Sequence, residues 1–268
     1  KAAGVVNTEK FLRKEEIVDI EEILDIFASR ASSHIGKLQV ELAQLKHLST
    51  RLIRGWTHLE RQKGGIGLRG PGETQLETDR RLISKRMKML NARLDKAHKQ
   101  REINRYSRKK SRNKLVALVG YTNAGKTTLF NKLTESFQVA EDKLFATLDS
   151  VTRKNKNPEH GPILFSDTVG FISDLPTQLI ESFKATLDEL KTADLLLHVV
   201  DISDVDYKIK INEVNSILCD LSLNNIPQII VNNKCDLVLC SKIESLKNRN
   251  PNQLFISAEN QTDFDDLR

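Results

Sequence analysis

Residues 120–128 of this 268-residue chain read Gly-Tyr-Thr-Asn-Ala-Gly-Lys-Thr-Thr and have the composition of a phosphate-binding loop. Every fixed position of the motif G-x-x-x-x-G-K-[ST] is filled, and the motif stands between an apolar run at 115–119 and a helical pattern. The glycines let backbone N–H groups turn toward a phosphate, and the N-terminus of the following helix adds positive charge. The sequence therefore predicts a nucleotide site whose contacts are Gly120, Tyr121, Thr122, Asn123, Ala124, Gly125, Lys126, Thr127 and Thr128.

The residues expected to act on the γ-phosphate and on Mg²⁺ come from three segments. Lys126 would reach the β- and γ-phosphates, and the Thr127 hydroxyl would ligate Mg²⁺. Asp167 follows an apolar run and would hold the metal through water, while the Gly170 N–H would meet the γ-phosphate. Thr147 would close on both as a switch threonine. The predicted catalytic residues are therefore Lys126, Thr147 and Gly170. The predicted metal ligands are Thr127, Thr147 and Asp167. The predicted neighbours in the site are Phe145, Ala146, Leu148, Asp149, Thr168 and Val169.

Two further motifs predict guanine as the base. Asp236 can accept hydrogen bonds from N1–H and from the exocyclic amine of guanine, a pair of contacts that adenine cannot return. Ser257-Ala258 follows the last apolar run and would place a backbone N–H on the guanine carbonyl oxygen. Four short motifs in this order, each at the end of an apolar run, predict a GTP-binding domain and disfavour an ATPase. The predicted base contacts are Asn233, Lys234, Cys235, Asp236, Ser257, Ala258 and Glu259.

The apolar runs that must position these motifs alternate with helical patterns, which predicts a parallel sheet with crossover helices. The runs lie at 115–119, 163–165, 195–200, 228–231 and 254–256, and helices fit near 127–133, 176–190 and 209–221. The motifs then lie at the carboxyl ends of strands, where open α/β sheets bind ligands. The predicted fold class is therefore α/β, with a P-loop GTPase domain at 114–268 that we expect to be truncated at its C-terminal end.

Two amphipathic stripes precede this domain. One includes Leu38, Leu42 and Trp56, and the other includes Met87 and Leu90, both at steps of three and four residues. Their matching period predicts an antiparallel helical hairpin over 36–105, in which Trp56 and the methionines serve packing. Residues 106–113 read as a linker, and residues 1–35 as part of an N-terminal α/β subdomain.

The predicted turn of the hairpin is unusually long and rich in glycine. Five of the 12 glycines of the chain lie between residues 64 and 72, flanked by helical patterns on both sides. No strand precedes them, which excludes a dinucleotide-binding fingerprint. Two interpretations stay open: a plain interhelix loop, or a flexible arm whose bare backbone and Arg69 approach nucleic acid closely.

The basic charge of the chain is concentrated in residues 80–114. This segment holds 15 lysines and arginines against two acids, whereas the whole chain has a net charge of only +6. A solvated helix face usually balances its charges at helical spacing, and like charges at this density favour a polyanionic partner. Tyr106 is the only aromatic residue in the segment, so we expect RNA to be recognised by backbone and shape rather than by base stacking.

Composition narrows the class of protein. With 39% hydrophobic and 29% charged residues, and no apolar run near the ~18 residues of a membrane span, the chain reads as a soluble protein without a membrane partner. Three cysteines without metal-like spacing indicate reduced thiols and a cytoplasmic location. The chain begins at Lys1 without a signal-like segment, so we expect it to start inside a longer protein. No motif suggests an oligomer, and a monomer is expected.

With these residues in view, nearly the whole chain resembles the HflX family of translation-associated GTPases. The most family-specific part is Gly67-Leu-Arg-Gly-Pro-Gly-Glu-Thr-Gln-Leu-Glu-Thr-Asp-Arg-Arg81, supported by 36–45, 145–149 and 167–171. The resemblance implies a GTPase that binds the large ribosomal subunit through rRNA, with the hairpin and glycine-rich arm near the peptidyl-transferase region. Bacterial members are implied to split stalled or idle ribosomes. Residues 1–22 match weakly, and Ser150-Val151 stands where Pro-Thr is expected.

Two residues bear on catalysis. Phe171 stands where Ras-type enzymes carry a water-orienting glutamine, so we expect slow intrinsic hydrolysis that ribosomes stimulate. Asn123 matches the position where potassium-stimulated relatives hold K⁺, which makes K⁺ a second candidate cation beside Mg²⁺. Two alternatives to ribosome splitting stay open: a large-subunit maturation factor, and an RNA-docking or anti-association module with negligible turnover. The hairpin could also hold a second nucleotide such as ATP.

Overall fold

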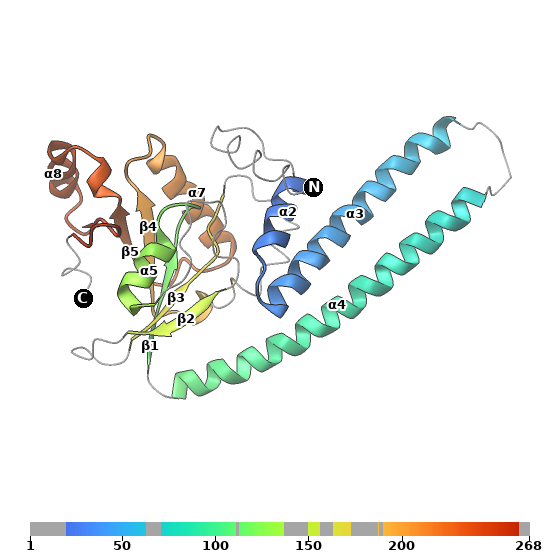
Figure 1. Ribbon diagram of the computed structural model, residues 1–268, viewed down its shortest axis with the longest axis horizontal. Coiled ribbons are helices and arrows are strands. Elements are labelled where there is room, and N and C mark those ends of the chain that lie inside the picture. Colours follow the sequence, from blue (N-terminus) through green and yellow to red (C-terminus); the bar gives the residue numbers. More distant parts are fainter. Residues whose placement is uncertain are drawn as a thin grey trace.

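The computed structural model describes residues 20–62, 71–110, 113–136, 150–155, 163–172, 187 and 190–262 (Figure 1). Within these residues the chain forms a helical part, α2 to α4, followed by an α/β part that contains a single six-stranded sheet. Residues 1–19 and 63–70, which include most of the predicted N-terminal subdomain and of the glycine-rich arm, lie outside the described residues.

The helical part consists of α2 (Ile20–Arg30), α3 (His34–Gln62) and α4 (Pro71–Lys110). Helices α3 and α4 lie side by side in opposite directions, and the ends they share in sequence point away from the sheet (Figure 1). Leu38 and Leu42 of α3 pack with Leu90 and Leu94 of α4, so the two leucine stripes are buried against each other. The antiparallel hairpin predicted from periodicity is therefore present.

Helix α4 is longer than the sequence pattern indicated. It begins at Pro71, where the missing N–H of proline costs nothing in a first turn, and it continues through residues 106–110, part of the linker expected from the sequence. Lysine and arginine are good helix formers, so a basic segment without glycine or proline extends a helix that leucine periodicity alone would end earlier. The basic segment is thus largely one continuous helix rather than a helix and a linker.

The sheet has the strand order β2-β3-β1-β4-β5-β6. All neighbouring strands are parallel except β2 and β3. The strands are β1 (Lys114–Val119), β2 (Val151–Lys154), β3 (Ile163–Asp167), β4 (Leu195–Asp201), β5 (Gln228–Asn233) and β6 (Leu254–Phe255). Five of them are the predicted apolar runs, whereas β2 is an edge strand whose polar residues Thr152, Arg153 and Lys154 carry no apolar signal.

Three α-helices are described around the sheet: α5 (Lys126–Thr134), α7 (Tyr207–Asp220) and α8 (Cys240–Arg249). Short 3₁₀ turns lie at η2 (Leu190–Thr192) and η3 (Cys235–Leu237). Helices α5 and α7 were predicted, but α8 was not, because its side chains are polar or exposed apart from a few that contact the sheet. The helix predicted near 176–190 falls almost entirely outside the described residues.

Strand β1 is buried on both faces, which explains its unbroken apolar sequence. Val116 and Leu118 point into a core with Phe130 of α5, while Ala117 and Val119 point into a second core that includes residues of α7. The strand order reverses at β1, because β3 pairs on one side and β4 on the other. The carboxyl end of β1 is therefore the switch point at which doubly wound sheets bind ligands, and residues 120–125 begin there.

Among the described residues, an apolar cluster joins the helical part to the α/β part. Val169, which follows the carboxyl end of β3, is 7% exposed and packs among residues from α2, from the connection that follows α2, and from α3. The partners are Ile23, Leu24, Phe27, Ala31, Val40 and Ala43. The predicted site segment 167–170 is thus in direct contact with the helical part.

Candidate functional site

The phosphate-binding loop has a backbone that only glycine accommodates at two positions. Gly120 has φ +149°, and a Cβ there would lie 2.2 Å from the carbonyl oxygen of Val199. Gly125 has φ +89°, and a Cβ there would lie 2.2 Å from Nδ2 of Asn233. Asn123 is also left-handed at φ +61°, a region that asparagine tolerates. The loop therefore turns tightly against β4 and β5, as a phosphate cradle requires.

Lys126 starts helix α5 and turns back over the loop. Its Nζ donates hydrogen bonds to the carbonyl oxygens of Gly120, at 3.1 Å, and Tyr121, at 2.7 Å. Burial lowers the pKa of Lys126 to about 8, although the nearby charge of Asp167 opposes the shift. The ammonium group is thus already held at the mouth of the loop and poorly solvated, which favours an incoming anion.

Two oxygen-bearing side chains of the kind that bind a hard cation meet beside the loop. Thr127 Oγ1 donates to Asp167 Oδ2 at 2.8 Å, and Asp167 is fully buried at the end of β3. The neighbouring Thr168 hydroxyl donates to the carbonyl oxygen of Leu118 at 2.6 Å, which fixes this segment to β1. A hydroxyl and a carboxylate at hydrogen-bond distance suit Mg²⁺, which takes few protein oxygens and completes its shell with water and phosphate.

Gly170 lies against the phosphate loop, and a Cβ there would be 3.0 Å from Lys126 Nζ. The next residue pairs with the loop through its backbone, because Phe171 N donates to Gly120 O at 3.1 Å and Thr122 N donates to Phe171 O at 2.7 Å. The phenyl ring of Phe171 is 2% exposed and packs in the α7-side core. The ring therefore fills the core and presents no group to a water molecule.

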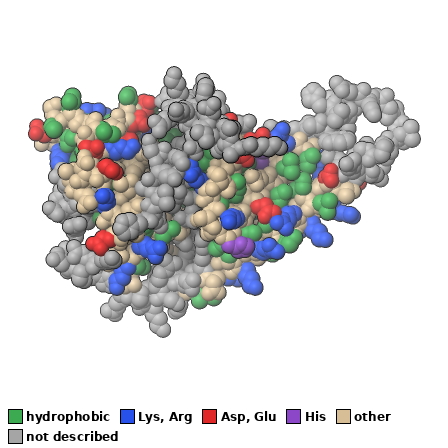
Figure 2. Space-filling model, in the orientation of Figure 1, with side chains coloured by type: hydrophobic (Ala, Val, Ile, Leu, Met, Phe, Trp, Pro, Cys, Tyr) green, Lys and Arg blue, Asp and Glu red, His purple; other side chains and the backbone are tan. Residues whose placement is uncertain are grey.

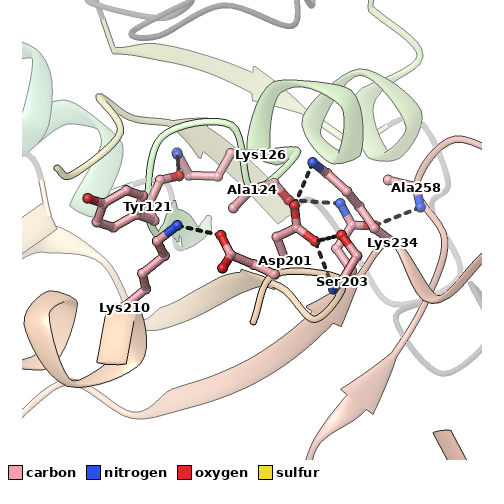
Figure 3. A network of polar contacts seen from close by, with 10 residues as sticks. Tyr121, Ala124, Lys126, Asp201, Ser203, Lys210, Lys234 and Ala258 are labelled. Carbon is pink, nitrogen blue, oxygen red and sulfur yellow. Dashed lines mark hydrogen bonds and ion pairs between the residues drawn. The ribbon is translucent and has the colours of Figure 1, made fainter. Parts of the chain in front are cut away.

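The loop expected to bind the base is joined to the phosphate loop by Asn233. Its Nδ2 donates to Ala124 O at 2.9 Å, and its Oδ1 accepts from Ala258 N at 2.9 Å (Figure 3). Asp236 Oδ1 accepts from the Ser257 hydroxyl at 2.6 Å. The segments 233–236 and 257–258 therefore meet, and the structure brings them to the same end of the sheet as the phosphate loop.

A polar network next to this loop was not foreseen from the sequence (Figure 3). Asp201, at the end of β4, forms an ion pair with Lys234, and Asp204 forms one with Lys210. Lys210 Nζ also lies 4.9 Å from the centre of the Tyr121 ring. The signal was present as two aspartates, at positions 201 and 204, directly after an apolar run, but it matches no phosphate or base motif.

The basic side chains of α4 are exposed where the structure describes them. Figure 2 shows lysines and arginines along this helix, and the exposed ones are Arg80, Arg81, Lys85, Arg86, Lys88, Arg93, Lys96 and Lys99. Arg86 alone has a described acidic partner across the hairpin, Glu41, at 2.6 Å. This face offers a long row of positive charge to a polyanion.

Some predicted site residues lie outside the described part of the chain. These are Phe145, Ala146, Thr147, Leu148 and Asp149, together with Arg69 of the arm. Glu259 is described and exposed, next to the buried Ala258. Of the described helices, none is long and apolar enough to cross a bilayer.

Comparisons with protein-family models match two regions of the chain. Residues 30–108 match a family described as "GTP-binding GTPase Middle Region", and residues 115–234 match one described as "50S ribosome-binding GTPase". The first match corresponds to the hairpin and the second to most of the α/β part.

Curated relatives agree with these matches. A protein named GTPase HflX from Escherichia coli (strain K12) is 54% identical over 239 residues, which are 88% of this chain and 56% of the relative. The GTPase HflX of Alkalihalophilus pseudofirmus is 56% identical over 80% of this chain and 51% of the relative. The chain thus spans between half and two thirds of the length of these relatives.

Solved structures share the architecture. A crystal structure of SsGBP in complex with GDP aligns over 100% of this chain and 76% of its own, with a TM-score of 0.56 and 26% identity. A GTP-binding protein from Sulfolobus solfataricus in complex with GDP aligns with a TM-score of 0.53 over 98% of this chain and 73% of its own. At 24% identity the second likeness concerns the fold alone.

Proposed function

We propose, from the premise that this chain belongs to the HflX family of GTPases, that it is a cytoplasmic, Mg²⁺-dependent GTPase that binds the large ribosomal subunit and couples its nucleotide state to ribosome splitting. Nucleotide binding is supported above all by the hydrogen bond from Asn233 Nδ2 to the carbonyl oxygen of Ala124. This hydrogen bond holds residues 233–236, which we call the base loop and which contain Asp236, against the phosphate loop next to Lys126. Guanine and the phosphates would therefore bind in one site.

Each step of nucleotide binding falls to a particular group of this chain. Lys126 exchanges its bonds with Gly120 and Tyr121 for the β- and γ-phosphates, while Asp236 accepts from N1–H and the exocyclic amine of guanine. Thr127 and Asp167 would hold Mg²⁺, which neutralises charge on the phosphates when bound. The Gly170 N–H, beside Lys126, would detect the γ-phosphate and thereby distinguish GTP from GDP.

Slow intrinsic turnover follows from Phe171. Its ring is buried in the core, so no polar side chain at this position orients the attacking water. We propose that ribosome contact supplies or reorders such a group, with Thr147 completing the metal site. Asn123 is the residue that would hold K⁺. An unchanged rate when Na⁺ replaces K⁺ in a turnover assay would remove potassium from the proposal.

The partner assignment rests on the charge of the helical part. The exposed row on α4 is not balanced by acids of its own helix, and phosphate contacts release counterions as they form. We propose that α3, α4 and the glycine-rich arm bind rRNA of the large subunit as a monomer. Maturation of that subunit would use the same surface on a different substrate, and an RNA-docking module would use it without turnover.

The test is GTP hydrolysis with and without purified ribosomes, with subunit separation followed by light scattering in the same cuvette. Strong stimulation together with GTP-dependent separation supports the coupled switch. Tight binding without stimulation or separation favours docking or maturation. The double variant Lys88→Glu/Lys96→Glu reverses two exposed charges of α4. It should weaken ribosome binding and reduce the salt dependence of that binding. Its affinity for GDP should stay unchanged.

A further inference from the structure

We propose that Asp201 is a positioning residue for guanine recognition, which acts on the base loop through Lys234. The inference rests on the proposed GTP site and adds to it a residue outside its sequence motifs. Asp201 is the last residue of β4, and none of the phosphate, magnesium or guanine motifs includes it.

The sheet register places Asp201 beside the base loop. Strands β4 and β5 are parallel, and Asp201 is the register partner of Asn233, the last residue of β5. Ile202 N donates to Asn233 O at 3.2 Å, so pairing continues one residue past the strands. The chain leaves β5 into Lys234 at this point, within reach of the Asp201 carboxylate.

Both oxygens of the Asp201 carboxylate have partners. Oδ2 lies 2.7 Å from Lys234 Nζ, and Oδ1 accepts from the backbone N of Ser203 at 3.0 Å and from its hydroxyl at 2.5 Å (Figure 3). The carboxylate cannot rotate away from Lys234 without breaking the bonds to Ser203. The side chains of Lys234 and Asp201 are only 25% and 22% exposed, so water and salt screen the pair less than a surface pair.

Lys234 is the residue at which the base loop needs an anchor. Its backbone is left-handed, with φ +63°, a conformation that a residue with a long side chain seldom adopts. It stands directly after Asn233 and two residues before Asp236. A side chain held at Asp201 therefore restrains the turn that aims the Asp236 carboxylate, and loss of that anchor lets the turn relax.

The neighbouring acid, Asp204, has a different direct partner from Asp201. Asp204 forms an ion pair with Lys210, whose Nζ lies over the Tyr121 ring of the phosphate loop. Asp201 is therefore the acid that pairs directly with Lys234, whereas Asp204 is hydrogen-bonded to Lys210 and interacts with Lys234 through charge without a direct contact. The alternative role for Asp201 is a local turn alone, because its bonds to Ser203 close an Asx-type turn.

Asp201→Asn separates the two roles, because the amide oxygen can still accept from Ser203 while the ion pair is lost. The experiment measures competition of GDP and of inorganic pyrophosphate against a fluorescent GDP analogue, for the wild type, Asp201→Asn, Lys234→Met and the double variant. Asp220→Asn, which removes the same charge at the exposed end of α7, is the control. We expect Asp201→Asn to weaken GDP binding by roughly three- to tenfold, with pyrophosphate and the control unchanged.

The double variant decides whether Asp201 acts through Lys234. If it does, adding Asp201→Asn to Lys234→Met causes no further loss of GDP affinity. Additive losses, or a parallel loss for pyrophosphate, would overturn the proposal. If Asp201→Asn destabilises the protein so much that GDP binding is lost through unfolding, Ser203→Ala is used in its place. This variant frees Asp201 Oδ1 from one donor and should give a smaller loss of GDP affinity, again without a loss of pyrophosphate affinity. A wild type that binds no GDP would contradict the proposed function instead.

Discussion

The carboxylate of Asp236 is held by the hydroxyl of Ser257, with 2.6 Å between Oδ1 and Oγ. The same hydroxyl accepts a hydrogen bond from Asn260 N at 3.2 Å, so its proton is directed toward Asp236. The two residues come from segments that follow β5 and β6, and their contact fixes the acceptor that would select guanine. In the proposed site, base selection by Asp236 would therefore depend on segments that follow two different strands rather than on one loop.

Asp236→Asn should change the preferred base from guanine to xanthine. An amide at this position offers one donor and one acceptor, which suits the C2 carbonyl of xanthine and leaves the guanine amine without its acceptor. We expect GDP affinity to fall by about a hundredfold or more and XDP affinity to exceed it. Competition binding with both nucleotides measures the change. An equal loss for both would show that the variant disturbs the loop rather than its selectivity.

Ser257→Ala should weaken guanine recognition without changing which base is preferred. It removes the donor that orients Asp236 and leaves the carboxylate in place, so we expect GDP affinity to fall by roughly three- to tenfold, which corresponds to the net contribution of one ordinary hydrogen bond. Equilibrium titration with a fluorescent GDP analogue gives the number. Ser203→Ala is not a control here, because Ser203 belongs to the Asp201 network, whereas the exposed Ser241→Ala is suitable. No change in Ser257→Ala would mean that the Asp236 carboxylate is held by the backbone alone.

The parts of the site that could be predicted are those whose conformation restricts the residue types of a short, continuous stretch of sequence. The phosphate loop has a strained backbone that demands glycine at positions 120 and 125, so its sequence is nearly determined by its conformation. Buried parallel strands demand unbroken apolar runs, and five of six strands were located in this way. In contrast, β2 was missed because it lies at the sheet edge with polar residues, and α8 was missed because none of its residues is fully buried.

The contacts that sequence reasoning missed are those between residues far apart in the chain. Asp201 and Lys234 are brought together by strand register, and Val169 meets Phe27 and Ala43 through docking of the helical part. Neither contact leaves a local pattern. The 106–110 segment illustrates a different limit, because helix propensity rather than a leucine stripe carries α4 to its end.

Nucleotide affinity should fall as the pH rises above about 8, the value to which burial lowers the pKa of Lys126. Phosphates bind the protonated amine, so above this pKa binding must first take up a proton, and affinity falls by up to about tenfold per pH unit. Calorimetry between pH 7 and 9, in buffers of different ionisation enthalpy, measures both the affinity and the proton uptake.

Lys126→Arg is the matched control for this titration, since arginine stays charged across the range. Its GDP affinity is expected to be lower but independent of pH. The stability of the nucleotide-free wild type should change in the opposite direction. Between about 8 and the ordinary lysine value of 10.5 the unfolded chain binds more protons than the native one, so the free energy of unfolding rises with pH in that window. A flat affinity profile would mean that Lys126 is fully solvated.

Phe27→Ala should alter the response to the γ-phosphate through the contact with Val169. Phe27 is 1% exposed, and its loss leaves a cavity in the cluster that joins α2 and α3 to the segment 167–170. The cost should be about 3 kcal/mol of the free energy of unfolding. Because Val169 lies between Asp167 and Gly170, the same cavity loosens the group expected to sense the γ-phosphate, while the base loop and Lys126 are untouched.

The measurement is the ratio of affinities for a non-hydrolysable GTP analogue and for GDP, together with urea unfolding. Phe27→Ala should change the ratio by several-fold, because only the triphosphate uses Gly170. Leu90→Ala is the control: Leu90 is fully buried between α3 and α4, so its removal destabilises the hairpin by a similar amount without touching Val169. If both variants left the ratio unchanged, the cluster would be packing only. If both variants changed the affinity ratio equally, general loosening of the helical part would be the cause. A changed ratio in Phe27→Ala alone would mean that nucleotide state and hairpin position are linked through Val169.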